Sequence, residues 1–232
     1  MSINLRRAQD RGHADHGWLK SYHTFSFADY HDPAHMNFRS LRVINEDYIE
    51  GGMGFGVHPH RDMEIITYVL EGTLAHKDSM GHQENIKAGD VQKMSAGSGV
   101  THSEFNADPK KSVHLFQIWI QPNKRGITPA YHQITVPKSF KDGLLLIAGD
   151  KKAPQTLPLE QDAQVFIGRF KAGTTYAYNI QPRRSVWLQM TSGHLMVNAQ
   201  ELNSSDAVAV ENESGFAIKT MKECEFLLFD LV

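Results

Sequence analysis

The fold of this chain is decided around Gly54-Phe55-Gly56-Val57-His58-Pro59-His60, a stretch in which two histidines flank a proline after alternating glycines. His58 and His60 are two positions apart, so on a β-strand their side chains leave the backbone from the same face. The stretch therefore predicts a strand that presents two imidazoles to one side.

A second stretch, Val100-Thr101-His102-Ser103-Glu104, repeats this spacing with one histidine and one carboxylate. Either motif alone is weak, because a chance His-x-His pair is expected in a chain of 232 residues with 13 histidines. Joined, they offer three imidazoles and a carboxylate, which suit Fe, Mn, Co, Ni, Cu or Zn. The absence of thiolates argues against a closed structural zinc site. We interpret His58, His60, His102 and Glu104 as the ligands of one metal ion.

Around these motifs the sequence is a series of short apolar runs separated by turn signals, which is typical of antiparallel β-structure. Strands are expected at 41–44, 63–70, 91–94, 100–105 and 114–120, with an edge strand near 24–27. Few helices are expected.

The second half of the chain repeats this plan. Residues 187–197 resemble 67–75, each with a glycine after an apolar run, and residues 205–210 resemble 89–94. Such a duplication predicts an all-β protein with two jelly-roll β-barrels in tandem.

The stretch from Pro122 to Pro129 has the composition of a connector, so we place a metal-binding barrel at 1–130 and a second barrel at 131–232. When the alignment is extended, the four candidate ligands correspond in the second repeat to Asn179, Gln181, Ile218 and Thr220. The second barrel is therefore expected to lack metal ligands.

Composition limits the function classes. The 232 residues are 41% hydrophobic, and 24 basic against 26 acidic residues give a net charge of −2. There is no basic footprint for nucleic acid and no apolar run long enough for a membrane span or a secretion signal. The single cysteine, Cys224, is typical of a reducing cytoplasm and lies in an apolar run that predicts a buried strand.

Glu64 is the main rival to Glu104. It follows His60 by four positions and shares its strand parity, so it is an alternative fourth ligand. It opens an apolar run, which favours a supporting role. The residues alone leave the two assignments open.

Other candidates have simpler interpretations. We expect capping or hydrogen-bonding roles for His13, His16 and His23. Solvated or structural positions are expected for His76, His82, His114, His132 and His194. Candidates for the lining of an aromatic-substrate pocket are Phe25, Phe27, Phe55, Met53 and Met63, although such residues are more often ordinary core.

Several longer motifs agree with this interpretation: Arg11-Gly12-His13, His16-Gly17-Trp18-Leu19, His23-Thr24-Phe25-Ser26-Phe27, Leu41-Arg42-Val43-Ile44-Asn45, His58-Pro59-His60-Arg61-Asp62-Met63-Glu64 and Ser95-Ala96-Gly97-Ser98-Gly99-Val100-Thr101-His102-Ser103-Glu104. Together they resemble the pirin family of the cupin superfamily, and within it the bacterial quercetin 2,3-dioxygenases. Resemblance is dense from about residue 6 to 122 and looser beyond. Gly97 departs from the general cupin pattern, in which proline is common at this position.

The resemblance implies a bicupin with one divalent metal in the N-terminal barrel, held by His58, His60, His102 and Glu104. Fe(II) is the first choice, with Mn, Co, Ni, Cu or Zn as alternatives. The implied reaction opens the heterocycle of a flavonol such as quercetin with O2 and releases carbon monoxide, with Glu104 as the catalytic base. We expect a cytoplasmic monomer that acts on a small phenolic substrate.

Two other functions remain open from the sequence. One is a regulatory pirin that senses redox state through its metal and acts through protein partners. The other is a cupin oxygenase with a different phenolic substrate.

Overall fold

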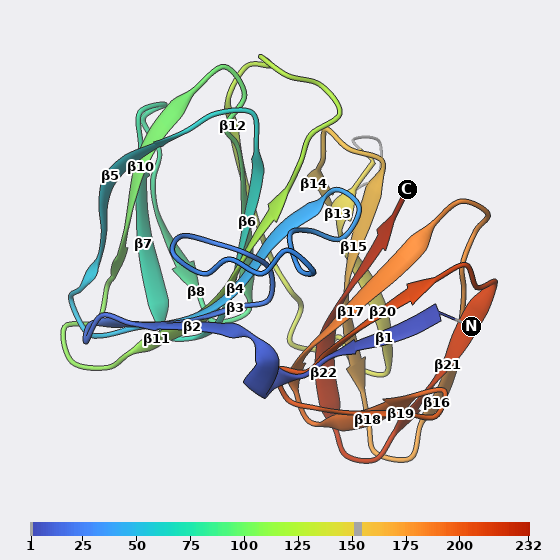
Figure 1. Ribbon diagram of the computed structural model, residues 1–232. Coiled ribbons are helices and arrows are strands. Elements are labelled where there is room, and N and C mark those ends of the chain that lie inside the picture. The colour runs from blue at the N-terminus through green and yellow to red at the C-terminus, as the bar shows by residue number, and fades with distance from the viewer. Residues whose placement is uncertain (1, 151–154) are drawn as a thin grey trace. The chain divides into compact units, whose positions relative to one another are not determined.

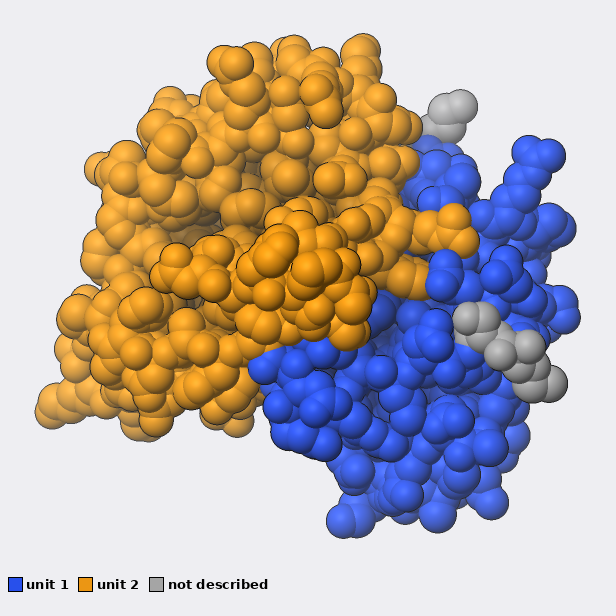
Figure 2. All heavy atoms as spheres, viewed as in Figure 1, with its two compact units in different colours: residues 1–11, 138–158, 162–232 blue, residues 12–137, 159–161 orange. Residues whose placement is uncertain are grey.

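The computed structural model describes residues 2–150 and 155–232. It is built from strands, whose arrangement Figure 1 shows. The described part of the chain has a single 3-10 helix. The chain divides into two compact units, coloured in Figure 2: residues 12–137 with 159–161, and residues 1–11 with 138–158 and 162–232. We call them the first and the second barrel. The expected all-β bicupin is confirmed.

The first barrel is made of two antiparallel sheets. Its seven-stranded sheet has the order β12-β9-β6-β11-β4-β3-β2, and its four-stranded sheet has the order β5-β10-β7-β8. The strands are β2 (Gly12–Asp15), β3 (Leu19–His23), β4 (Leu41–Ile49), β5 (Gly54–His60), β6 (Glu64–Glu71), β7 (Thr73–Asp78), β8 (Gln83–Lys87), β9 (Asp90–Ser95), β10 (Val100–Asn106), β11 (Val113–Ile120) and β12 (Ala130–Thr135).

The second barrel repeats this arrangement. Its sheets have the orders β1-β20-β17-β22-β15-β13-β14 and β16-β21-β18-β19. The elements are β1 (Ser2–Arg6), η1 (Ala8–Asp10), β13 (Gly143–Gly149), β14 (Leu157–Pro158), β15 (Ala163–Phe170), β16 (Thr175–Asn179), β17 (Ser185–Ser192), β18 (His194–Val197), β19 (Gln200–Asn203), β20 (Ala207–Glu211), β21 (Gly215–Thr220) and β22 (Cys224–Leu231).

The duplication extends to individual turn residues. Gly72 and Gly193 both have positive φ, +81° and +87°, at the turn that leads into the smaller sheet. Asp90 and Asp206 each use a side-chain oxygen to accept the backbone N–H three residues earlier, at 2.9 and 3.1 Å. The repeat read from the sequence is therefore a structural repeat.

The boundaries of the two units differ from the division expected at residue 130. Strand β12 pairs with β9 and so belongs to the first barrel. Strand β1 pairs with β20 and occupies in the second barrel the sheet position that β12 occupies in the first. The boundaries differ because they depend on which strands pair across long stretches of sequence, and local sequence patterns do not encode that pairing.

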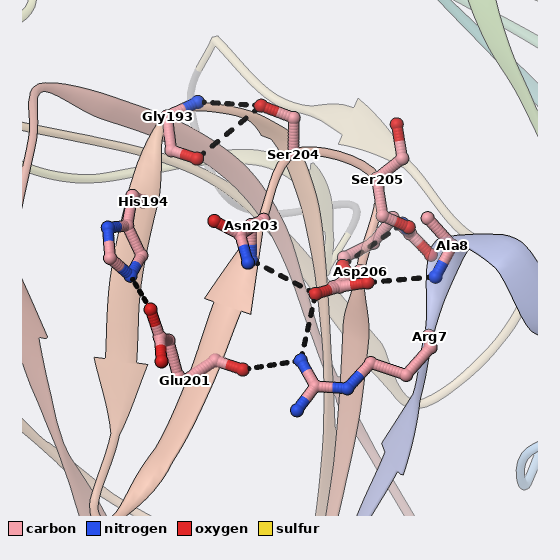
Figure 3. Close-up of polar contacts among 10 residues, drawn as sticks. Arg7, Ala8, Gly193, His194, Glu201, Asn203, Ser204, Ser205 and Asp206 are labelled. Atoms are coloured by element: carbon pink, nitrogen blue, oxygen red, sulfur yellow. Dashed lines mark hydrogen bonds and ion pairs between the residues drawn. The ribbon is translucent and has the colours of Figure 1, made fainter.

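The chain that follows β1 is fixed to the second barrel by Asp206, as Figure 3 shows. One carboxylate oxygen of Asp206 accepts the Ala8 N–H at 2.8 Å, and the other lies 3.0 Å from the guanidinium of Arg7. Arg7 also donates to the Glu201 carbonyl at 2.6 Å. These contacts tie both ends of the sequence into one unit.

The interiors of the two barrels differ in polarity. In the second barrel Ile218 and Phe216 of β21 are buried in an apolar cluster with Leu195 and Val197 of β18. In the first barrel the corresponding strands β10 and β7 bury His102, Glu104, His76 and Asp78. Polar chemistry is thus concentrated in the first barrel.

Three smaller expectations can be checked. No helix in the described residues is long and apolar enough to cross a membrane. Cys224 is buried in β22, and burial raises the pKa of its thiol to about 11, which makes it unreactive. The edge strand expected at 24–27 was wrong, because β3 ends at His23 and the edge next to it is formed by β2.

Candidate metal centre

Strands β5 and β10 bring the three candidate histidines together. His102 lies directly opposite His58 in the antiparallel register, and Val100 lies opposite His60. The ring centroids of His58 and His102 are 4.4 Å apart, and that of His60 lies 4.8 and 4.9 Å from them. Pro59 is tolerated because β5 is an edge strand, where its missing N–H costs no ladder bond.

One ring nitrogen from each of His58, His60 and His102 lies within 4.8 Å of the others. The Nδ1–H of His58 donates to the Gly56 carbonyl at 2.8 Å, which fixes the ring and leaves Nε2 free. Burial and neighbouring histidines lower the pKa of His60 to about 4 and that of His102 to about 2. Both rings are therefore neutral at pH 7, as metal ligands must be.

Glu104 points into the same barrel from β10. It is 2% exposed, and its Oε2 accepts a hydrogen bond from the Gln117 side chain at 2.9 Å. Burial raises the pKa of Glu104 to about 7, while the Gln117 bond lowers it and the nearby Asp47 raises it further. One oxygen of Glu104 lies within 4.8 Å of ring nitrogens of His102 and His76.

Glu64 lies in a different environment from Glu104. Its Oε2 is 2.8 Å from the Lys93 ammonium and accepts a hydrogen bond from the Ser95 hydroxyl at 3.2 Å. Both members of the ion pair are buried, on β6 and β9 of the larger sheet. The carboxylate of Glu64 is already neutralised by Lys93.

The polar atoms of this centre fit a cation. Both ring nitrogens of His102 and Oε1 of Glu104 are buried without a protein hydrogen-bond partner. Buried polar atoms are nearly always satisfied in folded proteins, and the unpartnered lone pairs of His102 and Glu104 are ones that a cation could satisfy. A divalent metal would satisfy imidazole nitrogens and a carboxylate together.

His76 is the residue of this centre that the sequence interpretation missed. It was expected to be solvated or structural, yet it is 1% exposed and lies opposite Glu104 on β7. Its ring centroid is 5.3 Å from that of His102. The spacing of His76 and Asp78, two positions apart, places both on one strand face, but it does not say whether that face turns inward.

A cavity of about 550 Å³ lies beside the histidines, within the size range of small-molecule sites. Its lining includes the two histidines of β5 and Glu104, together with the apolar and aromatic side chains of Leu19, Phe27, Tyr30, Phe55 and Trp119. Of the expected pocket residues, Phe27 and Phe55 line it, whereas Phe25 is core and Met53 is exposed.

The N-terminal histidines also line this cavity. His23 is buried and its Nδ1 shares a hydrogen bond of 2.9 Å with Asn45, and His13 stacks on Tyr22. His16 completes this part of the wall.

Gly97, the departure from the general cupin pattern, has a structural reason. Its φ is +48°, whereas the proline ring requires a φ of about −65°. A Cβ at this position would lie 2.1 Å from the Ile127 carbonyl oxygen. Only glycine fits this turn before β10.

Residues 4–120 match the family described as Pirin, and residues 146–231 match the family described as Quercetinase C-terminal cupin domain. The quercetin 2,3-dioxygenase of Escherichia coli K12 is 46% identical over 231 residues, which is 99% of this chain and 98% of that protein. The chain belongs to the pirin family. A putative quercetin 2,3-dioxygenase of Pseudomonas aeruginosa is 42% identical to this pirin, and the match covers 97% of this pirin and 98% of the relative.

Two solved structures share the fold of this pirin over nearly its whole length. The crystal structure of YhhW from E. coli superposes with a TM-score of 0.97 at 45% identity, covering 100% of this chain and 98% of the other. A second structure of YhhW, in complex with nickel(II), has a TM-score of 0.96 at 45% identity and covers 99% of each chain. This pirin has a histidine cluster able to bind metal, and a relative of the same fold has been crystallised with one.

Proposed function

We propose that this pirin is a metal-dependent quercetin 2,3-dioxygenase that opens the flavonol heterocycle with O2 and releases carbon monoxide. The observation that carries the proposal is that one ring nitrogen from each of His58, His60 and His102 lies within 4.8 Å of the others, beside a cavity with aromatic walls. The 46% identity to the E. coli enzyme over nearly the whole chain supports the substrate.

The ligands we assign are His58, His60, His102 and Glu104, in the first barrel only. Glu64 is not assigned, because Lys93 neutralises its carboxylate. A bound divalent metal would supply positive charge to stabilise the deprotonated substrate oxygen and a redox centre for O2. We propose Fe(II) as the native metal. Because the Irving–Williams order favours copper in vitro whatever metal the cell supplies, metal affinities do not identify the native metal. Elemental analysis of protein isolated without added metal tests the assignment of Fe(II).

Glu104 is also the catalytic base in this proposal. Its Oε1 has no protein partner, so an Oε1 that had left the metal would be free to receive the proton of the flavonol 3-hydroxyl. Burial raises the pKa of Glu104 to about 7, close to the value at which a general base works best near neutral pH. Gln117 keeps the other oxygen in place at 2.9 Å.

The cavity wall orients the substrate. Trp119 packs edge-on against His60 at 5.0 Å and against Phe27 at 5.4 Å, which gives a rigid aromatic surface beside the histidines. Flat aromatic ligands pack well on such surfaces and exclude water from the reacting carbons.

The test is turnover by the metal-loaded protein. Metal-free protein is reconstituted separately with Fe(II), Mn, Co, Ni and Cu, and loss of quercetin absorbance, O2 uptake and carbon monoxide are followed. We expect turnover with at least one metal, its loss in His58→Ala, and its retention in the control His194→Ala, a histidine of the second barrel. Absence of turnover with every metal would reject quercetin as the substrate, and a screen of other phenolics would follow.

The setting of the reaction is also a proposal. We place it in the cytoplasm, because a single cysteine is typical of proteins from a reducing compartment. We propose a monomer, and light scattering of the purified protein tests this.

A further inference from the structure

Two polar residues on β7 lie opposite the proposed ligands on the neighbouring strand β10. In the antiparallel register Asp78 is opposite His102, and His76 is opposite Glu104. Opposite residues of neighbouring strands project from the same face, with Cβ atoms about 5 Å apart. All four side chains therefore enter the barrel interior, where each is buried.

Both carboxylate oxygens of Asp78 have hydrogen-bonding partners. Its Oδ1 accepts the backbone N–H groups of Met80 and His82 at 2.9 and 3.1 Å. Its Oδ2 lies 3.3 Å from Nε2 of His76 and 3.0 Å from Nδ1 of His82. The two histidines thus share one carboxylate oxygen.

His76 faces the metal ligands, and His82 does not. One ring nitrogen of His76 lies within 4.8 Å of a ring nitrogen of His102 and of a Glu104 oxygen. Nδ1 of His76 has no protein partner, whereas Nε2 contacts Asp78. The His82 side chain is 38% exposed and stacks on Tyr131.

A histidine that binds a metal through one ring nitrogen carries an N–H on the other, and this N–H requires a hydrogen-bond acceptor. Such acceptors orient the ring and raise its basicity. His58 has this acceptor in the Gly56 carbonyl. His102 has none in the structure, since both its nitrogens are unpartnered. A nitrogen of His76 lies within 4.8 Å of a nitrogen of His102 without hydrogen-bonding to it in the structure, and Nδ1 of His76 is an available acceptor.

We propose that His76, anchored by Asp78, is a positioning residue that accepts the second N–H of His102 and holds that ring for metal binding. The proposal deepens the metal centre proposed above and rests on it. It requires His76 to keep its proton on Nε2, toward Asp78, so that Nδ1 carries the lone pair.

The decisive measurement is nickel(II) affinity of the metal-free full-length protein, with the visible spectrum of the cobalt(II)-loaded protein as a signature of ligand geometry. His76→Phe keeps the ring shape without its nitrogens. It should weaken nickel binding about 10- to 100-fold and shift the cobalt spectrum. The matched control His82→Phe also removes a ring contact to Asp78 and preserves stacking on Tyr131; it should leave both readouts unchanged.

Two further variants identify the nitrogen that matters. Asparagine places a polar atom near the position of Nδ1, and glutamine places one near Nε2, so His76→Asn should retain more nickel affinity than His76→Gln. This pair also decides the matter should His76→Phe fail to fold. Wild-type nickel affinity and spectrum in folded His76→Phe, or equal affinities of the Asn and Gln variants, would overturn the positioning role.

Failure of the metal centre itself gives a different result. If the wild-type protein does not bind nickel, or binds it equally well after His58→Ala, the proposed function fails first. If His58→Ala abolishes binding and His76→Phe does not weaken it, the metal centre stands and only the role of His76 is rejected.

Discussion

The carboxylate of Glu64 lies 2.8 Å from the ammonium of Lys93, and the two side chains are 1% and 2% exposed. This buried ion pair supports our proposal that Glu104, and not Glu64, is the carboxylate ligand of the metal. Its partner on β9 neutralises the charge, and Ser95 donates a further hydrogen bond to it.

Replacing Lys93 with methionine should destabilise the protein by about 3–5 kcal/mol, because it leaves the Glu64 carboxylate buried without a countercharge. Urea unfolding of the metal-free protein measures the change. The double variant Glu64→Gln/Lys93→Met should recover most of the loss, and Glu64→Gln alone should keep wild-type nickel affinity. Loss of nickel binding in Glu64→Gln would show that Glu64, rather than Glu104, completes the metal site.

Replacing Gln117 with leucine should move the acid limb of the pH–activity profile to higher pH. The amide bond from Gln117 lowers the pKa of Glu104, so removing it raises that pKa further, and more alkaline solution is needed to keep the carboxylate ionised. At pH 7 activity should fall about 10-fold. The control is Gln161→Leu, whose amide donates to the Gln121 carbonyl at 2.7 Å. An unchanged pH profile in Gln117→Leu would contradict the role of Glu104 as base.

Replacing Asp47 with asparagine should stabilise the metal-free protein in alkaline solution. Burial raises the pKa of Asp47 to about 7, although the Ser21 hydroxyl donates to it. The unfolded value is about 3.9, so the folded state favours the protonated acid, and the wild type loses stability as the pH rises from about 4 to 7. Asparagine does not ionise, and its gain should approach at most about 4 kcal/mol at pH 8 and vanish near pH 4.

Urea unfolding at several pH values measures this difference. Asp29→Asn, at an exposed position, serves as the control. A stability difference between Asp47→Asn and wild type that is the same at pH 5 and pH 8 would show that Asp47 is not a buried titrating acid.

Replacing Asp206 with alanine should release the N-terminal strand. It removes the acceptor of the Ala8 N–H and the countercharge of Arg7, at a cost of about 2–4 kcal/mol. Hydrogen exchange should show lost protection of the amides in residues 2–8. The matched variant Asp90→Ala removes the equivalent turn acceptor of the first barrel and should leave those amides protected. Equal protection of the N-terminal amides in both variants would contradict this role.

Much of the metal centre could be predicted from local spacing. The alternation of a strand places residues two positions apart on one face whatever the rest of the fold, so the pairs His58 with His60 and His102 with Glu104 could be recognised directly. The second barrel could be predicted because its turn residues Gly193 and Asp206 repeat Gly72 and Asp90, and each turn needs those residue types for its own geometry.

The burial of His76 could not be predicted in the same way. A strand has two faces, and the sequence does not say which of them turns inward, since that depends on pairing with β10. Glu64 illustrates the same limit: its parity matches that of His60, yet a turn separates β5 from β6 and the two residues end in different sheets.

By itself, the sequence determined the all-β class, the duplication and the pairs of residues that share a strand face, because alternation and turn chemistry act over a few neighbouring residues. Only the tertiary structure decided that Glu64 pairs with Lys93, that the ring of His76 lies near that of His102, and that the first strand completes the second barrel. Those outcomes depend on the register between strands far apart in the chain, and register is set by the packing of the whole barrel.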